Sequence, residues 1–300
     1  MNEIKLLDGA MGTQLMQAGL ELPLPIWSGD INITHPDHIQ NVHESYLKAG
    51  ADILTTNTFR TTPRAYLNHG FSLDKAMKRS RKSLYKAVQL AREVSNINTV
   101  IAGSIAPLED CYEPNLFPGV TYAKKEFNEL SNWLQDAGVD IIIFETMGSW
   151  PEIKSAILST DDVQISRWIS MILKDGKKLL DGTDLSEVLN NLLDYKIDMI
   201  LLNCNPCNIT NEALDIITKY WSKSWGVYPN IGTSIPSKEG IIEEKLSIDN
   251  FKKEINNCIN AGASVVGACC GSNPYYINAL RGLIDLHTKQ YLFFSNIHYL

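Results

Sequence analysis

The sequence predicts a single-domain (β/α)8 TIM barrel, an α/β fold, on three observations. Short aliphatic and β-branched segments alternate with longer amphipathic segments, and strands that alternate with helices indicate a parallel sheet. The alternation occurs eight times between residues 4 and 287, which is the number of units that closes such a barrel. The length of 300 residues also suits one barrel. A doubly wound open sheet is the alternative fold for this pattern.

Each predicted strand is a short run of aliphatic and β-branched residues. In chain order the predicted strands are residues 4–7, 51–55, 99–103, 140–144, 167–172, 199–203, 226–229 and 264–267. The seventh of these is the weakest prediction. Each strand is followed by a longer segment in which apolar residues recur at helical spacing.

These longer segments predict eight helices. They span residues 35–50, 74–95, 122–138, 150–159, 185–195, 211–222, 251–261 and 274–287. The first of them is expected to end at Gly50, since glycine commonly follows the last turn of a helix. Residues 1–288 are therefore assigned to the barrel. Residues 289–300 form an apolar, aromatic tail that is expected to pack on the barrel or on a neighbouring subunit, which leaves a homo-oligomer open.

Composition and charge exclude several classes of function. The chain is 44% hydrophobic and 20% charged, with a formal net charge of -7, and such an acidic balance argues against nucleic acid or an anionic membrane as partner. No apolar run reaches the roughly 18 residues that a membrane span needs. Residues 1–5 lack the basic and apolar regions of a signal peptide. We therefore expect a cytoplasmic protein.

The cysteines are the most informative residues. Cys269 and Cys270 follow the eighth predicted strand. Adjacent residues of a regular strand point to opposite faces, so these two can share one metal ion only where the strand has ended and the backbone turns. The flanking Gly267 and Gly271 permit that turn. Cys204 ends the sixth strand in a similar way, and three thiolates with one open position are typical of catalytic zinc.

The other cysteines are interpreted as structural or remain unassigned. Cys207 forms a C-x-x-C pattern with Cys204, but no second such pair supports a zinc clip or a redox motif. Cys258 lies in a helical pattern and is expected in the core, and Cys111 is a loop thiol without an assigned role. The six histidines show no paired spacing, so we expect none of them to bind metal.

Polar residues follow several other predicted strands. In a (β/α)8 barrel the carboxyl ends of the strands carry the chemistry. Asp8 and Glu145 follow the first and fourth strands, and their carboxylates could hold an ammonium group. Gly9 and Thr56 lie where backbone N–H groups could hold a carboxylate, and Asn57 follows directly. A small amino acid presents both groups.

Taken together, these motifs resemble the homocysteine S-methyltransferase family. That family includes the homocysteine-binding barrel of cobalamin-dependent methionine synthase, betaine–homocysteine methyltransferase and S-methylmethionine-dependent enzymes. The resemblance spans residues 4–286, and its motifs are residues 7–13, 55–59, 144–146, 203–204 and 267–271. It implies zinc ligands at Cys204, Cys269 and Cys270. It also implies that the homocysteine amino and carboxylate groups are held by Asp8, Gly9, Thr56, Asn57 and Glu145.

The sequence departs from the family pattern at a few positions. Gly267-Ala268 stands where a glycine pair is more common, and Ser272-Asn273 stands where two threonines are common. Leu201-Leu202 replaces a smaller, glycine-containing pair. None of these changes removes a predicted ligand. Residues 106–119 do not match the donor side of the betaine enzyme, which leaves the methyl donor open.

The resemblance implies a zinc-dependent enzyme that moves a methyl group to the zinc-bound thiolate of homocysteine and so produces methionine. S-methylmethionine or S-adenosylmethionine is favoured as donor, since the chain has no room for a folate-binding barrel or a cobalamin domain. One alternative is a module that methylates homocysteine, or another thiol or selenol, with a separate corrinoid or folate partner protein as methyl source. Another alternative is a non-catalytic barrel with structural zinc.

Overall fold

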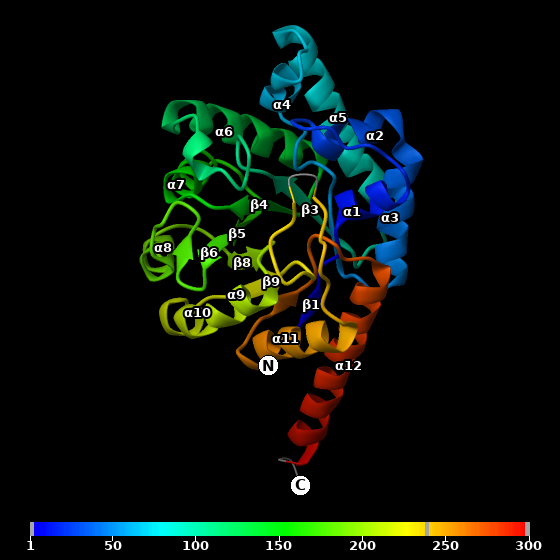
Figure 1. The fold of residues 1–300 in the computed structure, drawn as a ribbon, viewed down its shortest axis with the longest axis vertical. Helices are drawn as coiled ribbons and strands as arrows, with labels where there is room; N and C mark the ends of the chain where they lie inside the picture. The colour runs from blue at the N-terminus through cyan, green and yellow to red at the C-terminus, as the bar shows by residue number, and fades with distance from the viewer. Residues whose placement is uncertain (1–2, 238–239, 298–300) are drawn as a thin grey trace.

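The computed structural model describes residues 3–237 and 240–297, with side chains described up to residue 289. Its main sheet has eight parallel strands in the order β1-β10-β9-β8-β5-β4-β3-β2 (Figure 1). A parallel bridge between Leu7 and Ile53 joins the two ends of this order. The strands therefore close into the predicted (β/α)8 barrel, and the open sheet is excluded.

All eight predicted strands are present. Their bounds are β1 (Lys5–Leu6), β2 (Ile53–Thr55), β3 (Val100–Ile105), β4 (Ile141–Met147), β5 (Ser166–Met171), β8 (Met199–Asn203), β9 (Trp225–Tyr228) and β10 (Val265–Val266). A small antiparallel hairpin, β6 (Leu173–Asp175) and β7 (Lys178–Leu179), lies outside the barrel sheet.

The helices surround the barrel (Figure 1). Those that match predicted helices are α3 (Pro36–Lys48), α5 (Leu73–Val94), α6 (Val120–Ala137), α7 (Trp150–Leu158), α8 (Leu185–Leu192), α11 (Ile248–Asn260) and α12 (Pro274–Ile297). The first ends as predicted, because Gly50 has a φ of +101° and its N–H donates to the carbonyl of Leu47 at 2.9 Å.

Two helix predictions need correction. The segment predicted as one helix over residues 211–222 contains parts of two, α9 (Cys207–Glu212) and α10 (Leu214–Tyr220), which meet at Ala213. The last helix continues to Ile297 and takes in most of the predicted tail. Its C-terminal part extends beyond the barrel (Figure 1), and the packing of the tail side chains lies outside the described residues.

Short helices between the first strands were not predicted. They are α1 (Met11–Gln17), a 3-10 turn (Trp27–Asp30), α2 (Ile31–Thr34), α4 (Pro63–Asn68) and a second 3-10 turn (Pro114–Leu116).

The core forms two layers, because strand residues alternate between the inside of the barrel and the surrounding helices. Ile143, Trp168 and Leu201 belong to the cluster inside the barrel. Phe144 and Leu202, their neighbours along the strands, belong to the larger cluster between strands and helices. Within the described part of the chain, no helix combines the length and apolar character needed to cross a membrane.

Candidate functional site

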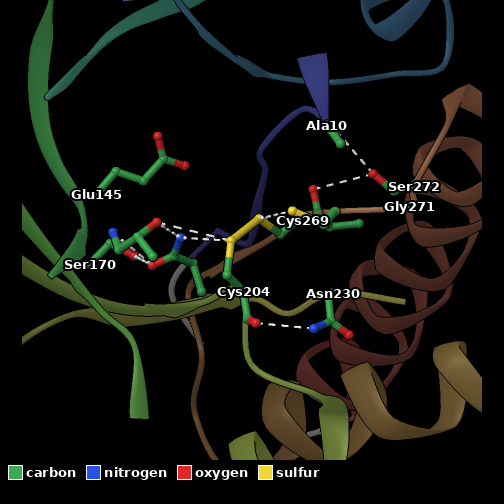
Figure 2. The surroundings of a disulfide bond; sticks show 12 residues. Ala10, Glu145, Ser170, Cys204, Asn230, Cys269, Gly271 and Ser272 are labelled. Carbon is green, nitrogen blue, oxygen red and sulfur yellow. Dashed lines mark hydrogen bonds between the residues drawn. A yellow bond between two sulfur atoms is a disulfide. The ribbon is translucent and has the colours of Figure 1, made fainter. Parts of the chain in front are cut away.

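The three predicted cysteine ligands lie together at the carboxyl ends of the strands. The sulfur atoms of Cys204, Cys269 and Cys270 all lie within 4.8 Å of one another. The structure records Cys204 and Cys269 as a disulfide with a Cα–Cα distance of 5.5 Å, shown in Figure 2. Cys270 Sγ lies 3.9 Å from Cys269 Sγ. Strand order explains this meeting, because β8 and β10 are separated only by β9.

Backbone turns bring these sulfurs to one place. Cys204 follows the last residue of β8 and has a φ of +56°, a left-handed conformation that costs a residue other than glycine about 1–3 kcal/mol. Regular strand geometry would send its side chain away from the barrel interior, and the turn brings it back. Strand β10 ends at Val266, and Gly271 has a φ of +81°. The chain therefore turns around Cys269 and Cys270, as predicted.

The donor set fits a zinc ion. Three sulfurs on a tetrahedral Zn²⁺ with bonds of about 2.3 Å lie about 3.8 Å apart, and the spacing of Cys269 and Cys270 agrees with this value. The disulfide must be reduced before all three thiolates can bind together. All three cysteines line a pocket at the carboxyl ends of the strands. A fourth ligand could therefore reach the metal from this pocket.

Two carboxyl groups, one buried and one half-buried, lie in the same pocket. Asp8 is 4% exposed, and its Oδ2 accepts a hydrogen bond from the backbone N–H of Thr55 at 2.9 Å. Burial raises the pKa of Asp8 to about 8. Glu145 accepts a hydrogen bond from the hydroxyl of Ser104, and burial raises the pKa of Glu145 as well. Neither carboxyl group forms an ion pair with a described Lys or Arg side chain, so a cationic ligand would supply the missing charge.

Two residues of the pocket lining have free backbone N–H groups. Gly9 and Asn57 line the pocket, and their N–H groups have no hydrogen-bond partner among the described residues. The N–H of Thr56 already donates to the carbonyl of Ala102 at 2.8 Å. The prediction of a free N–H near Thr56 therefore applies to Asn57 rather than to Thr56 itself. Gly9 cannot carry a side chain here, since a Cβ atom would lie 2.6 Å from the Tyr46 ring.

The Asn57 side chain has a supporting role. Its Nδ2 donates to the Ser28 carbonyl and to Asn32 Oδ1, both at 2.9 Å, and its Oδ1 accepts from the Ser28 hydroxyl. The amide group therefore joins the loop that follows β2 to the 3-10 turn and to α2. The Thr56 hydroxyl lies 2.8 Å from that of Thr58, so it too belongs to the loop.

Several pocket residues were missed by sequence reasoning. Trp27 has a φ of +53° and lines the pocket. Gly12 and Gly240 leave room for its indole, since a Cβ atom on either would lie 2.9 or 2.6 Å from the ring. Tyr228 is 3% exposed, and its hydroxyl has no hydrogen-bond partner among the described residues. Only its place at the end of the seventh predicted strand could have indicated Tyr228, and nothing in the local sequence indicates Trp27.

The pocket has a volume of about 420 Å³ and a lining of two chemical kinds. The carboxyl groups, the free N–H groups and the cysteines are here called the polar part. The apolar and aromatic lining residues, here called the aromatic part, include Met11, Met16, Trp27, Phe59, Tyr112 and Ile235. Cys111, which had no assigned role, also lines the pocket, and burial raises the pKa of its thiol to about 12. Cys207 and Cys258 lie in the hydrophobic core.

Comparisons with known proteins agree with the family resemblance seen in the sequence. The family model described as homocysteine S-methyltransferase matches residues 5–284. A protein named homocysteine S-methyltransferase from Escherichia coli K12 is 29% identical, with 93% of this chain and 94% of that protein covered. Homocysteine S-methyltransferase 2 of Arabidopsis thaliana is 27% identical, with 92% and 91% covered.

A solved structure shares the fold. The metallated form of the homocysteine methyltransferase MmuM from Escherichia coli superposes with a TM-score of 0.81 at 27% identity, covering 93% of this chain and 96% of that one. An oxidized form of the same protein gives a TM-score of 0.80. With the family model matching almost the whole barrel, these findings confirm the resemblance seen in the sequence. The chain belongs to the homocysteine S-methyltransferase family.

Proposed function

We propose that this protein is a zinc-dependent enzyme that transfers a methyl group from a small sulfonium donor, S-methylmethionine or S-adenosylmethionine, to homocysteine and so forms methionine. One observation carries the proposal. Three cysteine sulfurs lie within 4.8 Å of one another, in the wall of a pocket that is also lined by the carboxyl groups of Asp8 and Glu145. This combination suits a ligand that carries both a thiol and an amino group.

The cysteines explain how a thiol could react at neutral pH. A free alkyl thiol has a pKa of about 8.5 and is mostly protonated there. Zinc held by Cys204, Cys269 and Cys270 would supply the chemistry that removes this proton. Three anionic ligands leave the site electron-rich, which supports nucleophilic rather than electrophilic chemistry at the fourth position.

The polar part of the pocket would orient the amino acid. An ammonium group between Asp8 and Glu145 would replace the water that burial has removed from both carboxyl groups. The N–H groups of Gly9 and Asn57 would hold the carboxylate at the other side. When both charged groups are fixed, the length of the substrate side chain determines where its sulfur lies. Alignment of the sulfur with the methyl donor lowers the barrier to displacement.

The aromatic part of the pocket supports a cationic donor. The face of an indole attracts cations with an energy of about 0.5–2 kcal/mol, and Trp27 lines this part. Attack of a thiolate on the methyl carbon of a sulfonium forms one C–S bond as another breaks. The sulfonium electron pair returns to the leaving sulfur, so the two opposite charges disappear together. A pocket shielded from water favours this loss of charge.

The experiment that tests the proposal is a donor panel. Reduced, zinc-loaded protein is incubated with homocysteine and with S-methylmethionine, S-adenosylmethionine or betaine, and methionine is measured. We expect methionine with a sulfonium donor and a loss of at least 100-fold in Cys204→Ser. Absence of turnover with every small donor would overturn the proposal. Activity that appears only after a methylcobalamin-carrying protein is added would support the alternative with a corrinoid partner.

A second acceptor belongs in the same panel. A relative from Brassica oleracea named selenocysteine Se-methyltransferase is 26% identical, with 92% of this chain and 87% of that protein covered. Selenocysteine would place a more acidic selenol in the same pocket with a shorter side chain. Preference for selenocysteine over homocysteine in kcat/KM would move the proposal to the selenol alternative.

A further inference from the structure

Asn203, the last residue of β8, makes every hydrogen bond that its side-chain amide can offer. It is fully buried, at 0% exposure. Its Oδ1 accepts from the backbone N–H of Thr146 at 3.1 Å and from the hydroxyl of Ser170 at 2.7 Å. Its Nδ2 donates to Thr146 Oγ1 at 2.8 Å and to Cys204 Sγ at 3.3 Å. Figure 2 shows two of the residues that this amide contacts, Ser170 and Cys204.

This amide joins two strained turns. Thr146 and Cys204 have φ values of +60° and +56°, and they are two of only three residues other than glycine with positive φ in the described chain. Thr146 lies in β4, one residue before its end, and Cys204 directly follows β8. Left-handed conformations of this kind persist only where surrounding contacts enforce them. The Asn203 side chain contacts both residues and so supplies such contacts.

The three candidate ligands differ in their surroundings. Among the described residues, Cys204 is the only one of the three whose sulfur accepts a hydrogen bond from a side-chain N–H. The Thr146 hydroxyl oxygen also lies near this sulfur, at 4.0 Å. Cys204 is also the ligand that comes from a different part of the chain, 65 residues from Cys269. It is therefore the sulfur that most needs to be held in position.

We propose that Asn203 is a positioning residue that orients the Cys204 thiolate toward the metal and draws part of the charge from its sulfur. This inference rests on the proposed zinc site. Residues that hydrogen-bond to metal ligands typically contribute 10–100-fold to metal affinity or activity. Only an amide serves here, because the position requires two N–H donors and an acceptor for two further donors. Aspartate has the same shape but lacks the donors.

The test compares two Asn→Asp variants at positions two residues apart. Asn203→Asp keeps the acceptor for Thr146 and Ser170 but removes the N–H group that contacts Cys204. Asn205→Asp is the matched control. Asn205 is equally buried, its Oδ1 accepts from the N–H of Leu173 at 2.8 Å, and its Nδ2 has no partner among the described residues. Both variants add a carboxyl group within two residues of Cys204, but only position 203 contacts its sulfur. A difference between them therefore reports what the side chain at position 203 does at that sulfur.

Two readouts are needed, neither of which is activity. Zinc affinity is measured by competition with a chromophoric chelator, and we expect Asn203→Asp to weaken it by 10–100-fold, with a much smaller change for Asn205→Asp. In Co²⁺-loaded protein, loss of the N–H donor should move the thiolate-to-cobalt absorption of Asn203→Asp to longer wavelength. A merely structural role of Asn203 would not predict this shift.

The outcomes separate the inference from the proposed function. If wild-type protein binds no zinc at the cysteines, the proposed function fails. If wild-type protein binds zinc and Asn203→Asp matches Asn205→Asp in affinity and absorption, the inference alone is overturned. Should Asn203→Asp not fold, Thr146→Val replaces it, because it removes the hydroxyl that holds Nδ2 in place. Zinc affinity of Thr146→Val equal to that of wild type would then contradict the inference.

Discussion

At the scale of single residues, the buried carboxyl group of Asp8 makes stability depend on pH. Burial raises the pKa of Asp8 to about 8, whereas an unfolded chain would give about 3.9. Between these values the folded protein binds a proton that the unfolded chain has lost. Stability must therefore fall as the pH rises through this window. In the proposed function, the ammonium group of the substrate would restore the ionised form of Asp8.

Asp8→Asn removes this penalty and, under the proposed function, also weakens recognition of the ammonium group. We expect the melting temperature of Asp8→Asn minus that of wild type to grow from pH 5 to pH 8 and to level off above. Each kcal/mol corresponds to about 2–4 °C. The same variant should bind homocysteine at least tenfold more weakly. The control is Glu3→Gln, whose exposed side chain predicts no such trend. A difference that stays constant with pH would contradict the assignment of Asp8.

The sequence indicated the chemistry of single residues better than their conformation. Asp8, Glu145 and the cysteines were predicted from their places at strand ends, and the structure brings them to one pocket. The left-handed turns at Thr146 and Cys204 could not be predicted, because neither residue type favours that conformation. They arise from contacts between β4 and β8, which no local pattern records. The burial of the Tyr228 hydroxyl without a hydrogen-bond partner likewise depends on residues far away in the sequence.

At the scale of elements, the regular parts of the barrel were predictable and the pocket walls were not. Strands and long helices were found because their apolar periodicity is strong. The helices α1, α2 and α4 and the 3-10 turn at residues 27–30 have four to seven residues each. Such short elements give little periodicity. Two of them, α1 and the 3-10 turn that contains Trp27, nevertheless line the pocket.

Helix α1 offers a test of the donor side. Gly12→Ala would bring a Cβ atom to 2.9 Å from Trp27 Nε1, while alanine suits a helix better than glycine by about 1 kcal/mol. We expect a folded variant whose KM for the sulfonium donor rises about tenfold, with a smaller change in KM for homocysteine. Gly282→Ala in α12 is the matched control, because its Cβ atom meets nothing within 4 Å. Equal KM values in Gly12→Ala and wild type would remove Trp27 from the donor site.

At the scale of the whole molecule, closure of the barrel creates the site. Leu7 bridges to Ile53, so the ends of β1 and β2 stand beside those of β10 and β3. Asp8, Thr56 and Cys269 are therefore neighbours in one pocket although they are far apart in the chain. Eight alternations in the sequence predicted the barrel, whereas the distances between sulfurs depend on strand order and tilt, which only the folded structure provides.

The central claim is that three thiolates from two strands hold one zinc ion on which methyl transfer depends. The most direct measurement is the zinc content of reduced wild-type protein, Cys204→Ser and Cys270→Ala, determined by mass spectrometry alongside methionine formation and melting temperature. We predict about one zinc per wild-type chain, and in the variants a parallel loss of zinc and turnover with the fold retained. Full activity in a metal-free Cys270→Ala variant would contradict the claim. A collapse of melting temperature in Cys204→Ser would instead identify the zinc as structural.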